Sequence, residues 1–253
     1  MRSGFFPSIL SPGFSYSPFI HINQLIVFEE RSIFLKDSIK GILEELLILH
    51  PALDVCKDDI IRAWSILMKC FSMGRAVLIC GNGGSAADSE HMVGELMKNF
   101  RLKRKLPESD RISIYSACPE DAQYFVDRLQ GALPAISLVS QTSLTTAVSN
   151  DVDAEMIFAQ QVYGYRNLSG ALIAITTTGN SANVVNACKA AKAFKIPTIA
   201  LTGQSGGIVR DICDIAIRVP ATKVHKVQEF LLPVYHTLCA IVEDAYFGDT
   251  AGF

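Results

Sequence analysis

Short apolar runs alternate with helical patterns over most of the chain. The apolar runs fall at residues 77–79, 135–139, 171–175, 198–201 and 215–219, and the helical patterns between and after them fall at about 153–165, 182–195 and 225–246. Apolar runs of this length predict strands that are buried on both faces. Their alternation with helices predicts an α/β fold, a doubly wound parallel sheet with helices on both faces.

Two amphipathic helices are expected before the first strand, over residues 37–73, with a break near Pro51. Their apolar stripes contain Ile39, Ile42, Leu43, Leu46 and Leu47 in the first helix, and Ile60, Ile61, Trp64, Leu67, Met68 and Phe71 in the second. Residues at this spacing share one helix face, so each stripe predicts a packing surface rather than a cofactor site. Such a pair often packs against a partner subunit, which favours a dimer or tetramer.

The first 34 residues differ from the rest of the chain because they are rich in Phe, Ser and Pro. Pro7, Pro12 and Pro18 divide them into pieces too short for a signal-peptide core or a membrane span. We therefore expect a poorly ordered leader over residues 1–34 and a single domain over residues 35–253.

Composition limits the class of protein. The chain has 253 residues, 49% of them hydrophobic, which is enough for a sizeable core. A formal net charge of -2 gives no general attraction to nucleic acid. The seven cysteines form no C-x-x-C pair, as expected of reduced core residues in a cytoplasmic protein.

A glycine-rich turn follows the first apolar run and opens a helix. It reads Gly81-Asn82-Gly83-Gly84-Ser85. The glycines let the backbone bend sharply, and the free amides that begin the helix, together with the serine hydroxyl, are typical of an anion site. The turn matches neither the dinucleotide pattern G-x-G-x-x-G nor the Walker A pattern. Phosphate binding and a purely structural turn therefore both remain open at this point.

A second polar turn occupies the same place after another apolar run. It reads Thr176-Thr177-Thr178-Gly179-Asn180-Ser181. Its hydroxyls and the first amides of the next helix can surround a phosphate without any cation. Ordinary N-capping explains one or two of these residues but not the run of hydroxyls. Because ligands of such sheets gather at the carboxyl ends of strands, the two turns together favour a phosphate site.

His91 and Glu95 lie on the helix that the first turn opens, four residues apart. That spacing places both side chains on one helix face, about one turn apart. A surface contact between them is the plain alternative. The predicted phosphate site leads directly into the pair, which favours a chemical role.

Residues 101–134 lie between the two turns. They lack the alternation of apolar runs and helical patterns seen elsewhere. They open with the basic residues Arg101, Lys103, Arg104 and Lys105 and contain a short helical pattern at about 121–129. A basic run is usually a solvated face, and we expect one here. An insertion that covers the mouth of the site, or grips an acidic ligand, is the alternative.

Six motifs occur in a fixed order over residues 37–247. They are GNGGS followed by His91 and Glu95, VSND at 148–151, TTTGNSANV at 176–184, LTGQSGG at 201–207, IRVP at 217–220, and Gln228-Glu229 with His236. Together they resemble the sugar isomerase (SIS) domain of phosphoheptose isomerases. The resemblance implies a five-stranded parallel sheet flanked by helices, and a homotetramer with active sites at subunit interfaces. It also implies conversion of sedoheptulose 7-phosphate into a heptose 7-phosphate.

Carried over residue by residue, the resemblance implies roles for the site. The phosphate would be bound by Ser85, Thr176, Thr177, Thr178 and Ser181, and the rest of the substrate by Asn82, Gly83, Gly84, Asp151 and Gln228. A metal ion, usually zinc, would be held by His91, Glu95, Gln228 and His236. Glu95 would be the general base and His236 its acid/base partner.

The chemistry of an aldose–ketose isomerisation supports these residue types. One group must take a proton from carbon and return it to the neighbouring carbon, which suits Glu95 in a partly desolvated cleft. A histidine can move the hydroxyl protons, and zinc can stabilise the enediolate oxygens. Gln228 and His236 stand eight residues apart, roughly 12 Å along a helix. Both can bind one ion only if their side chains reach far, if the helix bends near Pro233, or if a second subunit contributes.

Two departures from the family pattern concern substrate contacts. Residues 224–226 are Val-His-Lys where the family tends to have an Asp, and Asn99 stands where it has an Arg. The residues of proton transfer are unchanged. A non-catalytic SIS protein, acting as a sugar-phosphate sensor or a scaffold for a protein partner, is the alternative function. Retention of Glu95 and His236 argues against it, because a scaffold needs neither.

Overall fold

The computed structural model describes residues 35–248, so the expected leader lies outside the described residues. The strands are β1 (Ala76–Gly81), β2 (Ala135–Ser137), β3 (Ser169–Thr176), β4 (Thr198–Thr202) and β5 (Ile215–Arg218). The helices are α1 (Asp37–Leu49), α2 (Lys57–Ser72), α3 (Gly84–Met97), α4 (Glu108–Ala117), α5 (Ala122–Arg128), α6 (Thr142–Val148), α7 (Ile157–Tyr165), α8 (Ala182–Ala193), α9 (Val209–Ile212) and α10 (Val224–Phe247). Short 3-10 or π-helical turns are η2 (Pro51–Cys56), η3 (Ser149–Asp153) and η4 (Ala154–Met156).

The five strands form one parallel sheet in the order β2-β1-β3-β4-β5. This order confirms the predicted doubly wound α/β fold. After β1 the chain forms β2 on one side of it, and it then crosses over β1 to form β3 on the other side. The crevice between β1 and β3 is therefore the switch point at which sheets of this order bind ligands.

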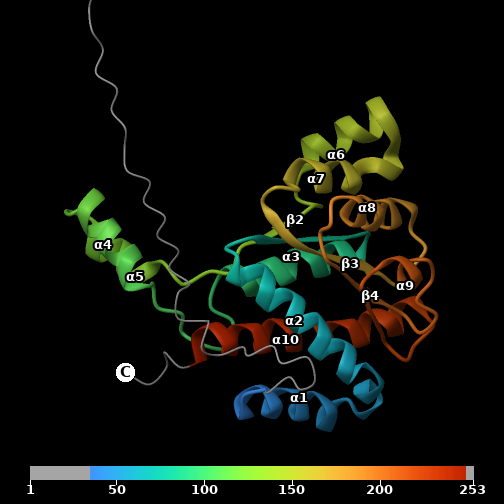
Figure 1. Cartoon of the computed structure of the whole chain (residues 1–253), viewed down its shortest axis with the longest axis horizontal. Helices are drawn as coiled ribbons and strands as arrows, with labels where there is room; N and C mark the ends of the chain where they lie inside the picture. The colour runs from blue at the N-terminus through green and yellow to red at the C-terminus, as the bar shows by residue number, and fades with distance from the viewer. Residues whose placement is uncertain (1–34, 249–253) are drawn as a thin grey trace, which may run out of the picture.

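Alternate strand residues fill two separate cores, as the period of two requires. Val77 and Ile79 of β1 pack toward α1, α2, α3 and α10, whereas Leu78 and Cys80 pack toward α7, α8 and α9. Figure 1 shows the two sets of helices on opposite faces of the sheet. Burial on both faces explains why the strands read as continuous apolar runs.

Most of the apolar stripe residues of α1 and α2 are buried in the subunit's own core, and Ile42, Leu47 and Ile61 are partly buried at its edge. Ile39 and Leu43 of α1 pack in the same core as Tyr235 and Leu238 of α10. The stripes are packing surfaces, as expected, and they pack mainly within the subunit itself. The expected dimer or tetramer therefore does not follow from them.

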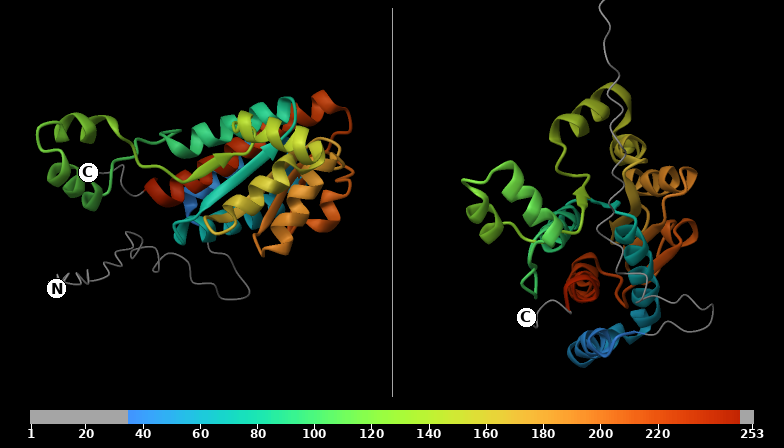
Figure 2. Two further views of the ribbon diagram at one scale, coloured as in Figure 1. Left: turned by 90° about the horizontal axis from the view of Figure 1, so that it is seen from above. Right: turned by 60° about the vertical axis from the view of Figure 1, so that its left-hand side comes forward.

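The segment between α3 and β2 forms a helical hairpin that stands away from the sheet in Figures 1 and 2. The short helix expected at about 121–129 is confirmed as α5. The pattern does not predict α4, because its apolar residues make no stripe: α4 buries none of its side chains.

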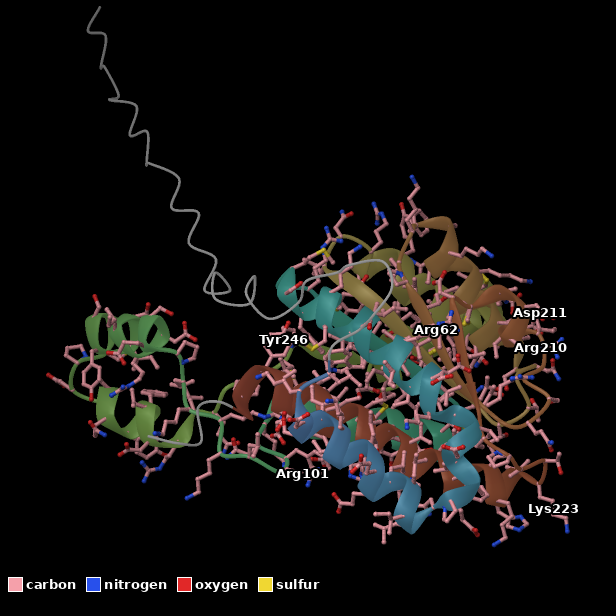
Figure 3. All side chains as sticks on the ribbon, turned by 60° about the horizontal axis from the view of Figure 1, so that its bottom comes forward. Arg62, Arg101, Arg210, Asp211, Lys223 and Tyr246 are labelled. Carbon is pink, nitrogen blue, oxygen red and sulfur yellow. The ribbon has the colours of Figure 1, made fainter. Side chains whose placement is uncertain are left out.

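The expectation of a solvated basic run is wrong for one of its members. Arg104 is 2% exposed and donates to Glu243 Oε1 over 2.7 Å, and both side chains are fully buried. Arg101 is partly exposed and lies beside α1, where it reaches Glu45 over 3.5 Å (Figure 3). Arg104 thus fixes the chain as it leaves α3, whereas Lys103 and Lys105 are exposed, as expected of a solvated run.

Candidate active site

The two polar turns meet at the switch point. Gly81 pairs with Ile175 at the ends of β1 and β3, so the turns that follow these strands are neighbours. The side-chain amides of Asn82 and Asn183 exchange two hydrogen bonds, of 2.8 and 3.0 Å, between the turns. Asn183 lies inside the TTTGNSANV motif but was given no role from the sequence. The pair fixes the separation of the two turns.

A side chain of α10 packs against the first turn. Gly83 has a φ of 56°, which suits glycine, and Gly84 then begins α3. The side-chain amide of Gln228 lies so close to Gly84 that a Cβ at that position would collide with its Nε2 atom. Ser85 is 3% exposed beneath it. Gln228 is therefore placed at the predicted phosphate turn.

The second turn presents its hydroxyls from a braced backbone. Thr176 is buried, and its Oγ1 lies 3.2 Å from Ser181 Oγ, while Thr177 is partly exposed and Thr178 exposed. The loop after β4 supports the turn, because Gly203 donates its N–H to the carbonyl of Thr177 over 3.1 Å. Backbone hydrogen bonds of this kind hold the hydroxyls in place before any ligand arrives.

His91, Glu95 and His236 meet between α3 and α10. His91 Nε2 lies 3.1 Å from Glu95 Oε1 and 3.5 Å from His236 Nε2. One nitrogen or oxygen of each residue lies within 4.8 Å of the others, a spacing that fits one metal ion. Burial, and next the neighbouring His91, lower the pKa of His236. The neutral imidazole that this favours is the form that binds a metal.

Gln228 and Asp151 are not brought into this cluster by the described contacts. Gln228 lies against Gly84, seven residues or about 10 Å before His91 along α3. Asp151 is exposed in η3, where its carboxylate accepts a hydrogen bond from the side chain of Asn150 over 2.8 Å. Within residues 35–248 it is hydrogen-bonded to neither polar turn.

Two residues next to the cluster were missed from the sequence. Tyr235 Oη lies 3.0 Å from His91 Nδ1 and donates to Asp88 Oδ1 over 3.3 Å. Burial raises the pKa of both Tyr235 and Asp88. The helical period offers a signal for Asp88, which precedes His91 by three residues on the same face. Tyr235 directly precedes His236, but its apolar neighbours make it read as core.

Two adjoining helix N-termini that offer hydroxyls, with a carboxylate and two imidazoles about two helical turns away, fit an enzyme that isomerises sugar phosphates. Comparison with known proteins agrees, although no protein-family model matches the chain. It is 34% identical to the phosphoheptose isomerase of Rhodospirillum rubrum over 211 residues, which are 83% of this chain and 98% of that protein. The chain belongs to the phosphoheptose isomerase family.

Further relatives agree in sequence and in structure. The phosphoheptose isomerase of Trichlorobacter lovleyi is 37% identical over 74% of this chain and 82% of its own length. The structure of phosphoheptose isomerase GmhA from Neisseria gonorrhoeae superposes with a TM-score of 0.58 at 28% identity, covering 82% of this chain and 92% of that one. A phosphoheptose isomerase from Francisella tularensis gives 0.55 at 29% identity, over 82% and 94%.

Proposed function

We propose that the protein isomerises sedoheptulose 7-phosphate to D-glycero-D-manno-heptose 7-phosphate through an enediol. The observation that carries this proposal is the separation of the two parts of the site. Gly84 and His91 are seven residues apart on α3, about 10 Å. Eight bonds join C1 of the sugar to the phosphorus, and at the roughly 1.2 Å per bond of an extended chain they also span about 10 Å.

The chain's own residues perform the proposed reaction in three parts. The hydroxyls of Ser85, Thr176, Thr177, Thr178 and Ser181, with the first amides of α3 and α8, hold the phosphate. Glu95, whose side chain is 14% exposed, takes a proton from C1 and returns it to C2. His236 moves the proton between the oxygens on C1 and C2.

Zinc is the proposed cofactor, and His91, Glu95 and His236 are the residues of this subunit that would hold it. Nitrogen and carboxylate oxygen donors suit zinc. When bound, the ion would supply positive charge to stabilise the negative oxygens of the enediol state. Gln228 serves as a fourth ligand only if its side chain leaves Gly84.

The test of the proposed function is a panel of C5 to C7 ketose phosphates incubated with the protein in deuterated water. NMR of the products identifies the aldose formed and locates the new deuterium. We expect the C7 substrate to be converted fastest, with deuterium at C2 of the product, because the proton on Glu95 exchanges with solvent. Faster conversion of a C5 or C6 substrate would contradict the assignment of the sugar.

A prediction for the phosphate turns follows from their hydroxyls. Ser181→Ala should weaken sugar-phosphate binding by about ten- to a hundredfold, the cost of one hydrogen bond to a charged group. Thr177→Val should weaken it more, since it also places an apolar branch beside the anion. Calorimetric titration with the substrate measures both, and Ser113→Ala on the exposed hairpin is the control. Unchanged affinity in both variants would remove these residues from the site.

We also propose a cytoplasmic homotetramer with active sites at the subunit interfaces. Support comes from membership of the family and from exposed apolar residues near the end of α1, where Ile48, Leu49 and Val55 are 77, 66 and 72% exposed. No helix within residues 35–248 is long and apolar enough to cross a membrane. Light scattering should give four times the mass of the chain, and a single-chain mass would contradict the proposal.

A further inference from the structure

Tyr235 joins two residues of α3 through its hydroxyl. The side chain is fully buried on α10, and its Oη atom lies 3.0 Å from His91 Nδ1 and 3.3 Å from Asp88 Oδ1. His91 presents its other nitrogen, Nε2, to Glu95 and His236. A continuous row of polar atoms therefore runs from Asp88 through Tyr235 to the proposed metal ligands.

The direction of the hydrogen bonds along this row follows from the number of protons that each group can donate. A phenol has one proton to donate, and an ionised carboxylate can only accept. Once Tyr235 donates to Asp88, its oxygen can only accept from His91, so Nδ1 of His91 carries the ring proton. Nε2 then keeps its lone pair, which is the requirement for binding a metal ion.

Asp88 gives a reason for this direction over the reverse one. If Tyr235 donated to His91, the ring proton would move to Nε2 and bond Glu95, and Asp88 would lose the donor. Asp88 Oδ2 is already buried without a hydrogen-bond partner in the described part of the chain. Removing the donor to Oδ1 would leave the carboxylate with neither oxygen paired, which is costly for a half-buried charge. In the favoured direction Glu95 loses the His91 proton instead, but it lies beside a His91 side chain that is 44% exposed, where water or the metal ion can replace that donor.

We propose that Asp88 and Tyr235 act as a positioning pair that fixes His91 as the Nδ1–H tautomer and so keeps Nε2 free for the metal ion. Neither residue touches the reacting atoms in this role. The part concerning metal affinity rests on the proposed zinc site. The tautomer itself does not, because it is a property of the protein without metal.

Tyr235→Phe is the variant that tests the pair with the least disturbance. The ring of Tyr235 makes edge contacts with His91 and His236, with centroids 5.7 and 5.0 Å apart, and Phe preserves both. Only the hydroxyl is lost. Tyr246→Phe is the matched control, since Tyr246 also lies on α10 and its partly buried hydroxyl donates to the carbonyl of Met68 over 3.2 Å.

The first measurement is the tautomer of His91 in metal-free protein. Long-range proton–nitrogen NMR of ¹⁵N-histidine protein at alkaline pH distinguishes a protonated Nδ1 from a protonated Nε2. We expect the Nδ1–H form in the parent and in Tyr246→Phe, and a shift toward Nε2–H bonded to Glu95 in Tyr235→Phe. A parent with Nε2–H, or a Tyr235→Phe spectrum identical to that of the parent, would overturn the proposal.

The second measurement is zinc affinity by competition with a chelator. Loss of the residue that orients a histidine ligand typically costs ten- to a hundredfold in metal affinity, and we expect that loss in Tyr235→Phe but not in Tyr246→Phe. Asp88→Ala should show a similar loss, because the phenol proton is then free to turn to His91. The double variant should be no weaker than either single one, since both remove the same constraint.

These measurements distinguish a failure of the proposed positioning pair from a failure of the proposed function. A parent that binds no zinc would contradict the cofactor assignment, while the NMR result would still decide the tautomer. Losses of zinc affinity that add in the double variant would contradict a shared role for Asp88 and Tyr235. Thermal unfolding of each variant shows that the compared proteins are folded.

Discussion

Glu95→Gln should lower turnover of the sugar phosphate by about 10²- to 10⁴-fold, the range typical when a general base is lost. Gln keeps the shape of the side chain and one oxygen acceptor, but it cannot take a proton from carbon. Steady-state kinetics should show the loss in kcat. Binding of the substrate should survive, because Ser85 and the turn from Thr176 to Ser181 are unchanged.

The control for this variant is Glu90→Gln on the same helix. Glu90 is exposed and accepts a hydrogen bond from Ser140 over 2.9 Å, which Gln can also accept, so its turnover should match that of the parent. Zinc must be measured on each sample, since Glu95 is also a proposed ligand. A Glu95→Gln protein that isomerises at the parent rate would disprove the proposed mechanism.

The fold was predictable from the sequence wherever the apolar residues followed one clear spacing, either that of a strand or that of a helix. Five apolar runs gave the five strands, and the long helical patterns gave α8 and α10 to within two residues at each end. The hairpin and η3 were less readable, because exposed helices such as α4 carry no apolar stripe. The partners of α1 and α2 were also hidden, since a stripe shows that a face is covered but not by what.

The candidate site was likewise predictable only in part. Local spacing predicts that His91 faces Glu95, whereas His236 was assigned to the same site only through the family resemblance. The structure places it beside His91, from a helix far along the chain. The sequence alone could not place Gln228 at Gly84 rather than at the cluster of His91, Glu95 and His236, because that placement depends on how α3 and α10 lie side by side. The roles of Tyr235 and Arg104 were hidden for a related reason: each looks like an ordinary core or surface residue until its partner is known.

Arg104 and Glu243 form a buried ion pair that secures the end of α3. Arg104 donates to the carbonyls of Leu96 and Glu95 over 2.6 and 2.7 Å, and Glu243 accepts the backbone N–H groups of Phe100, Arg101 and Leu102 over 2.9, 2.7 and 3.2 Å. The pair thus holds the turn that carries the proposed base. Its charges balance only while both partners are present.

Glu243→Gln should lower the free energy of unfolding by about 3 to 5 kcal/mol, because it leaves the buried Arg104 charge uncompensated. In a domain of this size the loss corresponds to a fall in Tm of roughly 6 to 20 °C. Glu229→Gln is the matched control on α10. Its ion pair with Lys226 has the same 2.7 Å length but is more than half exposed, so it should cost at most about 1 kcal/mol. Denaturant unfolding measures both variants, and equal midpoints would show that the buried pair contributes no more than a surface one.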